Sequence, residues 1–259
     1  MATDRNPYAR PNVAATADVG IDQGLRSYML RVYNYMALGL VATGIAALAI
    51  VSLATTSPAA SNAVAQLPNG MALTQFGVMM YTSWVKWVVM LAPLGMVFFL
   101  SARIGSMAPA TAQIAFFAFA AMMGASLSSI FLVYTAESIV QVFFITSAAF
   151  GALSLYGYTT KKDLSGWGSF LFMGLIGIII ASLVNIFLQS SALGFAVSVI
   201  GVLVFAGLTA YDTQRIKEMY YVGDDGTVAS RKAIMGALSL YLNFINMFVM
   251  LLSLFGNRE

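Results

Sequence analysis

The chain has 259 residues, of which 60% are hydrophobic and only 9% are charged. A soluble domain usually has about a quarter charged residues and less than half apolar ones, so this balance indicates a protein dissolved in lipid. The chain contains no Cys and no His. Their absence excludes disulfides, Cys/His metal sites and any Ser–His or Cys–His nucleophile. We therefore predict an all-α polytopic membrane protein that is not an enzyme and has no cofactor.

Residues 1–24 are polar, mixed and proline-containing, which predicts a disordered cytoplasmic tail. The first apolar run starts too late and is too long for a signal peptide. Residues 25–259 are expected to form one membrane domain. Its first outer loop, Ala54 to Ser83, is uncharged and has an apolar patch at Met71–Met80, so it is expected to lie partly on the membrane surface.

Seven apolar segments without a charged residue predict a bundle of seven transmembrane helices. Most approach the ~20 residues that cross ~30 Å of hydrocarbon as an α-helix. They lack the alternation of a membrane β-barrel. The segments are Val32–Leu53, Trp87–Ala102, Ala110–Leu132, Ile139–Tyr158, Trp167–Leu188, Leu193–Tyr211 and Ala233–Phe255. The second helix is expected to extend back through Lys86, whose side chain can reach the membrane surface by snorkelling. The last two helices are expected to cover residues 193–220 and 232–255.

The Lys and Arg residues lie almost entirely on one side of these segments. Only Lys86 and Arg258 fall on the other side. By the positive-inside rule, the N-terminus is expected in the cytoplasm and, after seven spans, the C-terminus outside. The eleven residues assigned to the cytoplasmic side are Arg5, Arg10, Arg26, Arg31, Arg103, Lys161, Lys162, Arg215, Lys217, Arg231 and Lys232.

Asp212 is the first candidate for a functional residue because it directly follows the sixth apolar segment. One interpretation is a solvated acid at the cytoplasmic end of that helix. However, the stretch after it has no Gly or Pro before Gly223, so the helix is expected to continue. If the membrane edge lies near Tyr220, Asp212 is ~12 Å inside. An intramembrane carboxylate usually faces a polar interior and serves a function, which favours a role for Asp212.

The last segment carries a polar stripe, since Ser239, Asn243 and Asn246 fall at positions i, i+4 and i+7. Such amides either bond neighbouring helices together or line a pathway, and both interpretations stay open. Counted from Lys232, Asn243 is ~16 Å into the helix. It therefore lies within about one turn of the depth of Asp212, so the two side chains are expected to meet.

Other polar residues are weaker candidates for the same site. Arg103 is either a topology anchor or a cation that pairs with Asp212. Asn185 is a further candidate for the polar lining, and Gln113 and Glu137 are more remote ones.

The segments "AYDTQRIK" and "ALSLYLNFINMF" resemble the transmembrane Bax inhibitor motif family, most closely its bacterial YccA-like branch. The segments "RVYNYMALGL" and "KKDLS" fit the same branch. The resemblance covers the chain from about Arg26. It implies a seven-helix fold with a central last helix in the bacterial cytoplasmic (inner) membrane.

The same resemblance implies a pH-sensitive cation leak, described for calcium. The helix-six acid, matching Asp212, then pairs with an acid on the last helix, and an arginine that matches Arg103 bonds it in the closed form. Asp212 would be a ligand of the cation. The bacterial branch is also associated with a membrane-anchored AAA protease and with stress. A non-transporting modulator that binds this protease is therefore the alternative function.

The sequence departs from the family at one position, because "LYLNFIN" stands where the family usually has "LYLDFIN". Two nearby carboxylates share a proton, whereas an acid beside the amide of Asn243 does not. A calcium site also loses one hard anionic ligand. Asn243 is therefore expected to weaken both calcium leak and pH control.

Two other classes of membrane protein fail on composition. A serine protease suggested by "GASLSS" has no His base, and no lysine lies within the seven apolar segments. A retinal protein needs a lysine in the last helix for its Schiff base, and residues 233–257 contain none.

Overall fold

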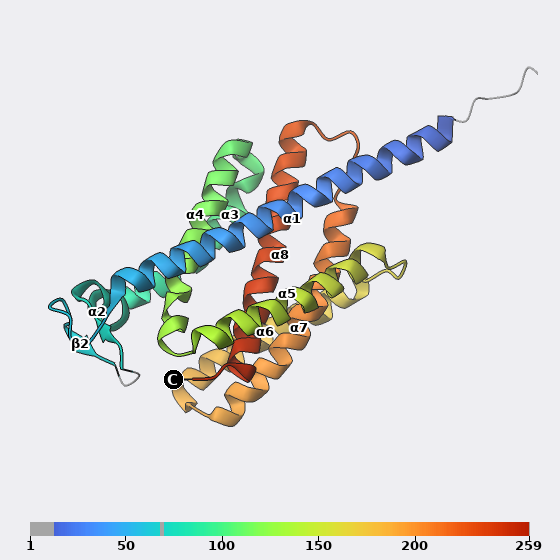
Figure 1. Ribbon diagram of the computed structural model, residues 1–259. Coiled ribbons are helices and arrows are strands. Elements are labelled where there is room, and N and C mark those ends of the chain that lie inside the picture. The colour runs from blue at the N-terminus through green and yellow to red at the C-terminus, as the bar shows by residue number, and fades with distance from the viewer. Residues whose placement is uncertain (1–12, 68–69, 259) are drawn as a thin grey trace, which may run out of the picture.

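The computed structural model describes residues 13–67 and 70–258, with side chains from residue 23 onward. Within these ranges seven helices are long and apolar enough to span a membrane, which confirms the predicted all-α seven-helix architecture (Figure 1). They are α1 (Val13–Ala54), α3 (Val85–Arg103), α4 (Pro109–Leu127), α5 (Ala136–Thr159), α6 (Ser165–Leu188), α7 (Ser191–Glu218) and α8 (Gly226–Phe255). Short 3-10 helices follow α3 (Ile104–Ser106) and α4 (Ser128–Leu132).

The first helix starts earlier than the sequence indicates. Of the tail predicted at residues 1–24, residues 1–12 lie outside the described residues. From Val13 onward the chain is helical, so α1 has 42 residues and its first turns project beyond the other helices (Figure 1). Composition alone does not show this, because polar residues at a helix end carry no apolar periodicity.

The segment between α1 and α3 folds into a small structure that the hydropathy pattern does not predict. Strands β1 (Thr55–Thr56), β2 (Ala65–Gln66) and β3 (Ala72–Leu73) form an antiparallel sheet in the order β1-β3-β2. Leu73 is opposite Thr55 in one ladder and Ala65 in the other. The short helix α2 (Gln75–Thr82) follows the sheet. Two-residue strands are too short for an alternation signal.

Side-chain caps fix where several helices begin. The hydroxyls of Thr74, Thr135 and Ser190 accept hydrogen bonds from backbone N–H groups in the first turns of α2, α5 and α7. The carboxylate of Asp225 accepts one from Val228 N at 2.7 Å at the start of α8. These residues satisfy N–H groups that the helix itself leaves free.

Helix α8 is the centre of the bundle. In an apolar stretch of 18 residues within α8, 56% of the residues are buried, compared with 11% in the corresponding stretch of α6. It packs against α1, α4, α5 and α7, whereas α6 lies at the edge beside α7 (Figure 1). The last helix is therefore central, as the resemblance implies.

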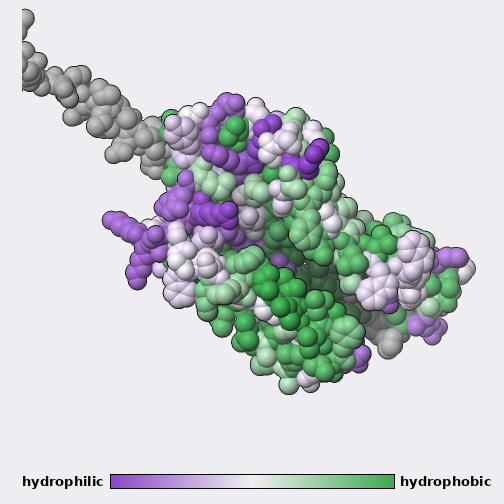
Figure 2. Space-filling model, turned by 180° about the vertical axis from the view of Figure 1, so that it is seen from behind, coloured by the Kyte–Doolittle hydropathy of each residue, from purple (hydrophilic) through white to green (hydrophobic). Residues whose placement is uncertain are grey.

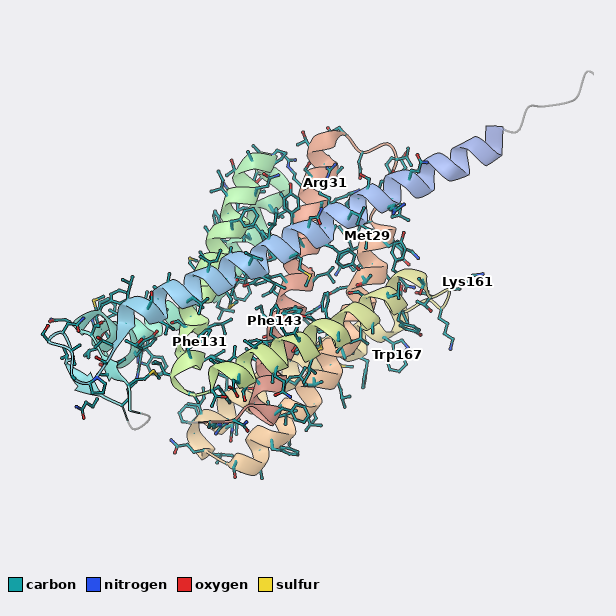
Figure 3. All side chains as sticks on the ribbon, in the orientation of Figure 1. Met29, Arg31, Phe131, Phe143, Lys161 and Trp167 are labelled. Carbon is teal, nitrogen blue, oxygen red and sulfur yellow. The ribbon has the colours of Figure 1, made fainter. Side chains whose placement is uncertain are left out.

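The outside of the bundle is largely apolar. Exposed side chains on α6 include Phe170, Met173 and Phe187, the last 88% exposed. Hydrophilic residues gather at one end of the face shown in Figure 2, and hydrophobic residues surround a hollow in its middle. At the α5–α6 loop, Lys161 extends away from the helices, and Trp167 is on the first turns of α6 (Figure 3). A surface of this kind is stable only when lipid covers it.

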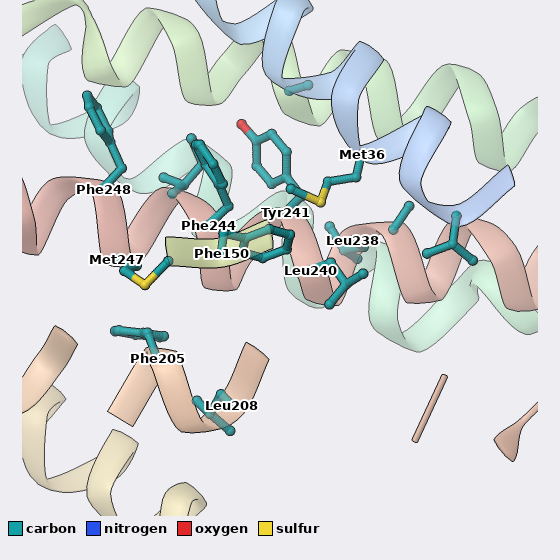
Figure 4. Packing of buried hydrophobic residues seen from close by; sticks show 14 of the residues in the cluster. Met36, Phe150, Phe205, Leu208, Leu238, Leu240, Tyr241, Phe244, Met247 and Phe248 are labelled. Carbon is teal, nitrogen blue, oxygen red and sulfur yellow. The ribbon is translucent and has the colours of Figure 1, made fainter. Parts of the chain in front are cut away.

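Aromatic rings of α8 pack against three neighbouring helices. The ring of Phe244 lies 5.5 Å from that of Phe150 on α5 (Figure 4). The ring of Tyr241 lies 5.9 Å from that of Phe116 on α4. The Tyr241 hydroxyl is 2.6 Å from the hydroxyl of Thr43 on α1. The Thr43 hydroxyl is also within hydrogen-bond distance of two carbonyl oxygens, those of Gly39 on α1 and Ala120 on α4. A buried phenol is tolerated there because its hydroxyl has a partner.

A close backbone contact between α5 and α7 gives a stability prediction. A Cβ added at Gly157 would lie 2.2 Å from the carbonyl oxygen of Ala210. Gly157→Leu therefore forces the two helices apart, and we expect a loss of about 3 kcal/mol of stability or more. Thermal unfolding in detergent measures it. The matched control is Gly151→Leu on the same helix, where an added Cβ meets no atom within 4 Å. Equal stability of the two variants would contradict the close packing.

Candidate functional site

Asp212 on α7 and Asn243 on α8 form a hydrogen-bonded pair inside the bundle. The Nδ2 of Asn243 donates to the Oδ2 of Asp212 at 2.7 Å. Asn243 is buried and Asp212 is half-buried. The two helices run as a hairpin, so residues at similar depth face each other, as the sequence predicts. The acid is directed at a protein partner and at the cavity described next.

A cavity of about 550 Å³ adjoins the pair. It lies between α6, α7 and α8, and it extends from the first turn of α6 toward the middle of the bundle. Its polar lining is Ser165, Ser169, Asp212, Arg215, Ser239, Asn243 and Asn246. Because Ser165 and Arg215 stand at the end with the basic loops, the cavity reaches inward from that end.

The predicted polar stripe of α8 faces this cavity. Ser239 and Asn246 line it together with Asn243. The Nδ2 of Asn246 donates to the carbonyl oxygen of Leu242 at 2.8 Å, one turn back on its own helix. Its amide is therefore not used to join two helices in this structure, which leaves its oxygen available to the cavity.

The structure does not bring Arg103 to Asp212. Arg103 is exposed at the end of α3. Among the described residues the one salt bridge joins Lys232 to Asp224 at 2.6 Å. The cation that shares the cavity with Asp212 is Arg215, one turn further along α7. An arginine at i+3 stands on the same helix face as the acid.

Three weaker candidates also lie away from the pair. Asn185 is at the far end of α6, where its Oδ1 accepts a hydrogen bond from Ser190 N at 3.0 Å and closes the turn to α7. Gln113 donates to the hydroxyl of Tyr35. Glu137 is in the first turn of α5. Asn185 is therefore a turn residue here and not part of the cavity lining.

Gln214 is a residue that sequence reasoning missed. Its buried side chain donates from Nε2 to Lys162 O and accepts at Oε1 from Leu164 N, both at 2.8 Å. It thereby ties α7, two residues after Asp212, to the α5–α6 loop. Its place within "AYDTQRIK" was the one feature of the sequence that could have drawn attention to it. Its hydrogen-bond partners are backbone groups of Lys162 and Leu164, which no sequence pattern identifies.

The chemistry of this lining suits a weakly held cation. It offers one carboxylate, two amide oxygens and several hydroxyls, all of them hard oxygen ligands. In the part of the chain that the structure describes, no three acidic residues gather as a metal site. The Asn243 amide also presents its N–H to Asp212, so in this arrangement it holds the carboxylate instead of offering its own oxygen.

Comparison with known proteins shows a matching family and relatives that cover most of the chain. A family model described as inhibitor of apoptosis-promoting Bax1 matches residues 25–259. A protein of Caulobacter vibrioides is 48% identical over 254 residues, which are 97% of each chain. A protein of Rickettsia prowazekii is 46% identical over 97% of this chain and 98% of its own length. The inner membrane protein YbhL of Escherichia coli is 45% identical over 91% of this chain and 94% of its own.

Proposed function

The chain belongs to the Bax inhibitor family of integral membrane proteins, and from this premise we propose that it is a slow cation leak of the bacterial inner membrane. The observation that carries the proposal is the Asp212–Asn243 contact beside a cavity. A lone carboxylate at membrane depth is costly unless it serves a pathway or a binding site. The relative from Escherichia coli is named an inner membrane protein, which supports that location.

The geometry suggests how the leak is restrained. In the arrangement described, Asn243 donates to the carboxylate and Gln214 holds the end of α7. A cation that enters beside Arg215 must replace the amide N–H at Asp212. With one negative charge in the pair, divalent affinity is low and control by protons is weak, because no second acid competes for a proton.

Flux across proteoliposomes tests this function. The purified chain is reconstituted with a calcium or potassium indicator inside, and a gradient is imposed at several pH values. We expect slow flux above that of empty vesicles, with only a shallow dependence on pH. Flux no greater than in empty vesicles, with the protein folded and inserted, would rule out the leak.

A non-transporting modulator of a membrane-anchored AAA protease is the alternative function. The observation in its favour is α1, whose first turns project beyond the other helices at the end with the basic loops (Figure 1). This alternative predicts no flux in proteoliposomes, together with a complex that forms when the chain and the protease are reconstituted together.

The orientation is also a proposal, with the N-terminus in the cytoplasm and the C-terminus outside. It rests on the distribution of basic residues, eleven of thirteen on one side. Fusing reporters after the last residue tests it. We expect a reporter that works only outside the cytoplasm to be active there, and one that works only in the cytoplasm to be silent. The reverse result would overturn this topology.

A further inference from the structure

A groove opens between α1 and α5 on the outside of the bundle, apart from the cavity at Asp212. Its volume is about 650 Å³. It is lined on α1 by residues from Arg26 to Tyr33 and on α5 by residues from Phe150 to Tyr158. At 1.5 Å per residue it runs ~10–12 Å along the helices, which is most of the ~15 Å of hydrocarbon in one leaflet.

The mouth of this groove is cationic. Arg26 is exposed. The Nζ of Lys217 lies 5.6 Å from the centre of the Tyr158 ring and donates to Tyr158 O at 2.9 Å. Among the described residues neither cation has an acid within salt-bridge distance, and none of the residues that line the groove is acidic. Arg26 and Lys217 therefore place positive charge at this mouth without an acidic partner among the residues whose side chains the structure describes.

The interior of the groove is apolar. Met29 and Phe150 are buried side chains that form its floor. Figure 3 shows Met29 on the side of α1 that faces α5, with Arg31 on the other side. Gly151 leaves open space on α5, since a Cβ there meets no atom within 4 Å. A cationic end above an apolar channel matches a molecule with an anionic head and a hydrocarbon chain.

We propose that this groove binds an anionic phospholipid of the cytoplasmic leaflet, with its phosphate near Arg26 and Lys217 and one acyl chain over Met29 and Phe150. Anionic lipids of that leaflet attract basic residues near the surface, and Tyr and Trp side chains favour the headgroup level. The floor also includes Ser154, whose hydroxyl accepts from Thr213 at 3.4 Å. A lipid bound in the groove therefore lies against Ser154, whose hydrogen-bond partner Thr213 directly follows Asp212 in the sequence.

A second groove, between α5, α6 and α7, lacks this charge pattern. It is lined by Lys162 and Asp163 side by side. Hydrogen bonds from Ser165 keep the pKa of Asp163 below its ordinary value, so this carboxylate stays ionised and cancels the lysine. Of these two grooves beside α5, the α1–α5 groove is thus the one suited to an anionic headgroup.

Quenching by brominated lipid tests the proposal on the full chain. Trp84, Trp87 and Trp167 are changed to Phe, and Leu155→Trp places a reporter on the groove wall. The protein is reconstituted in phosphatidylcholine with a minor share of brominated phosphatidylglycerol or brominated phosphatidylcholine. We expect the anionic lipid to quench preferentially. Arg26→Gln should reduce that preference about fivefold, with a similar further loss for Lys217→Gln.

Matched variants distinguish binding of the lipid headgroup from binding of its acyl chain. Arg31→Gln removes a cation from the same helix outside the groove and should leave the preference unchanged. Gly151→Leu fills the channel and should reduce quenching by both lipids, whereas Gly177→Leu, also in open space, should not. Equal quenching by both lipids in the starting protein would overturn the proposal. Absence of quenching by either would also overturn it, because protein, such as a second copy, would then cover the groove.

Discussion

Asp212→Asn is expected to reduce cation flux by about tenfold or more. The acid is the one negative charge that lines the cavity among the described residues. A cation ~4 Å from a carboxylate gains about 4 kcal/mol at an effective dielectric constant of ~20, so its loss removes most of the attraction in the pathway. The measurement is calcium and potassium flux from proteoliposomes at one fixed pH.

The control for this variant is an acid on the same helix. Glu218→Gln removes an exposed carboxylate at the end of α7 and should leave flux within about twofold, because screened surface charges act weakly. Asp212→Asn should also remain folded, since the amide oxygen at 212 still accepts the hydrogen bond from Asn243, although more weakly than a carboxylate does. Unchanged flux in a folded Asp212→Asn protein would show that the acid is not in the pathway.

Asn243→Asp is expected to make flux steeply dependent on pH. The Nδ2 of Asn243 is 2.7 Å from the Oδ2 of Asp212, so an acid at 243 places two carboxylates in contact. Two ionised groups repel by about 4 kcal/mol at ~4 Å and an effective dielectric constant of ~20, and the pair therefore retains one proton until the pH is raised. Calcium affinity should increase as pH rises, because loss of this proton delivers the second charge.

The double variant Asp212→Asn with Asn243→Asp distinguishes charge number from position. It restores one acid and one amide with their places exchanged. Its flux is expected to return toward that of the original protein, with the same shallow dependence on pH.

If the original protein already leaks calcium with a steep dependence on pH and Asn243→Asp matches it, a shared proton does not control the flux. Arg103 and Glu137 would then be the next residues to change.

The seven spans, the polar stripe of α8 and the depth at which Asp212 and Asn243 meet could all be predicted from the sequence. These features follow from local properties. Hydropathy over about 20 residues decides insertion, and a helix advances 1.5 Å per residue, so depth can be counted along the chain. The hairpin of α7 and α8 then brings residues at equal depth together, as the hydrogen bond at 2.7 Å bears out.

The other polar contacts could not be predicted from the sequence, because they depend on how the helices pack. Arg103 was either a topology anchor or a partner of the acid, and Asn185 was a weaker candidate for the lining. Arg103 stands exposed at the end of α3, and Asn185 closes a turn. Arg215 lines the cavity with Asp212 instead, and Gln214 ties α7 to the α5–α6 loop. The rotation and crossing of each helix select such neighbours, and both depend on packing between segments that are distant in the sequence.

The central place of α8 likewise depends on packing between helices and not on hydrophobicity. The most apolar span is α6, with a mean hydropathy of 2.6, yet only 11% of its window is buried. Helix α8 has a mean hydropathy of 1.9 and is 56% buried. Lipid is as apolar as leucine, so hydrophobicity does not drive one helix against another inside the membrane. Small residues, shape and polar contacts place α8 in the centre, while the most apolar helix is left facing the lipid.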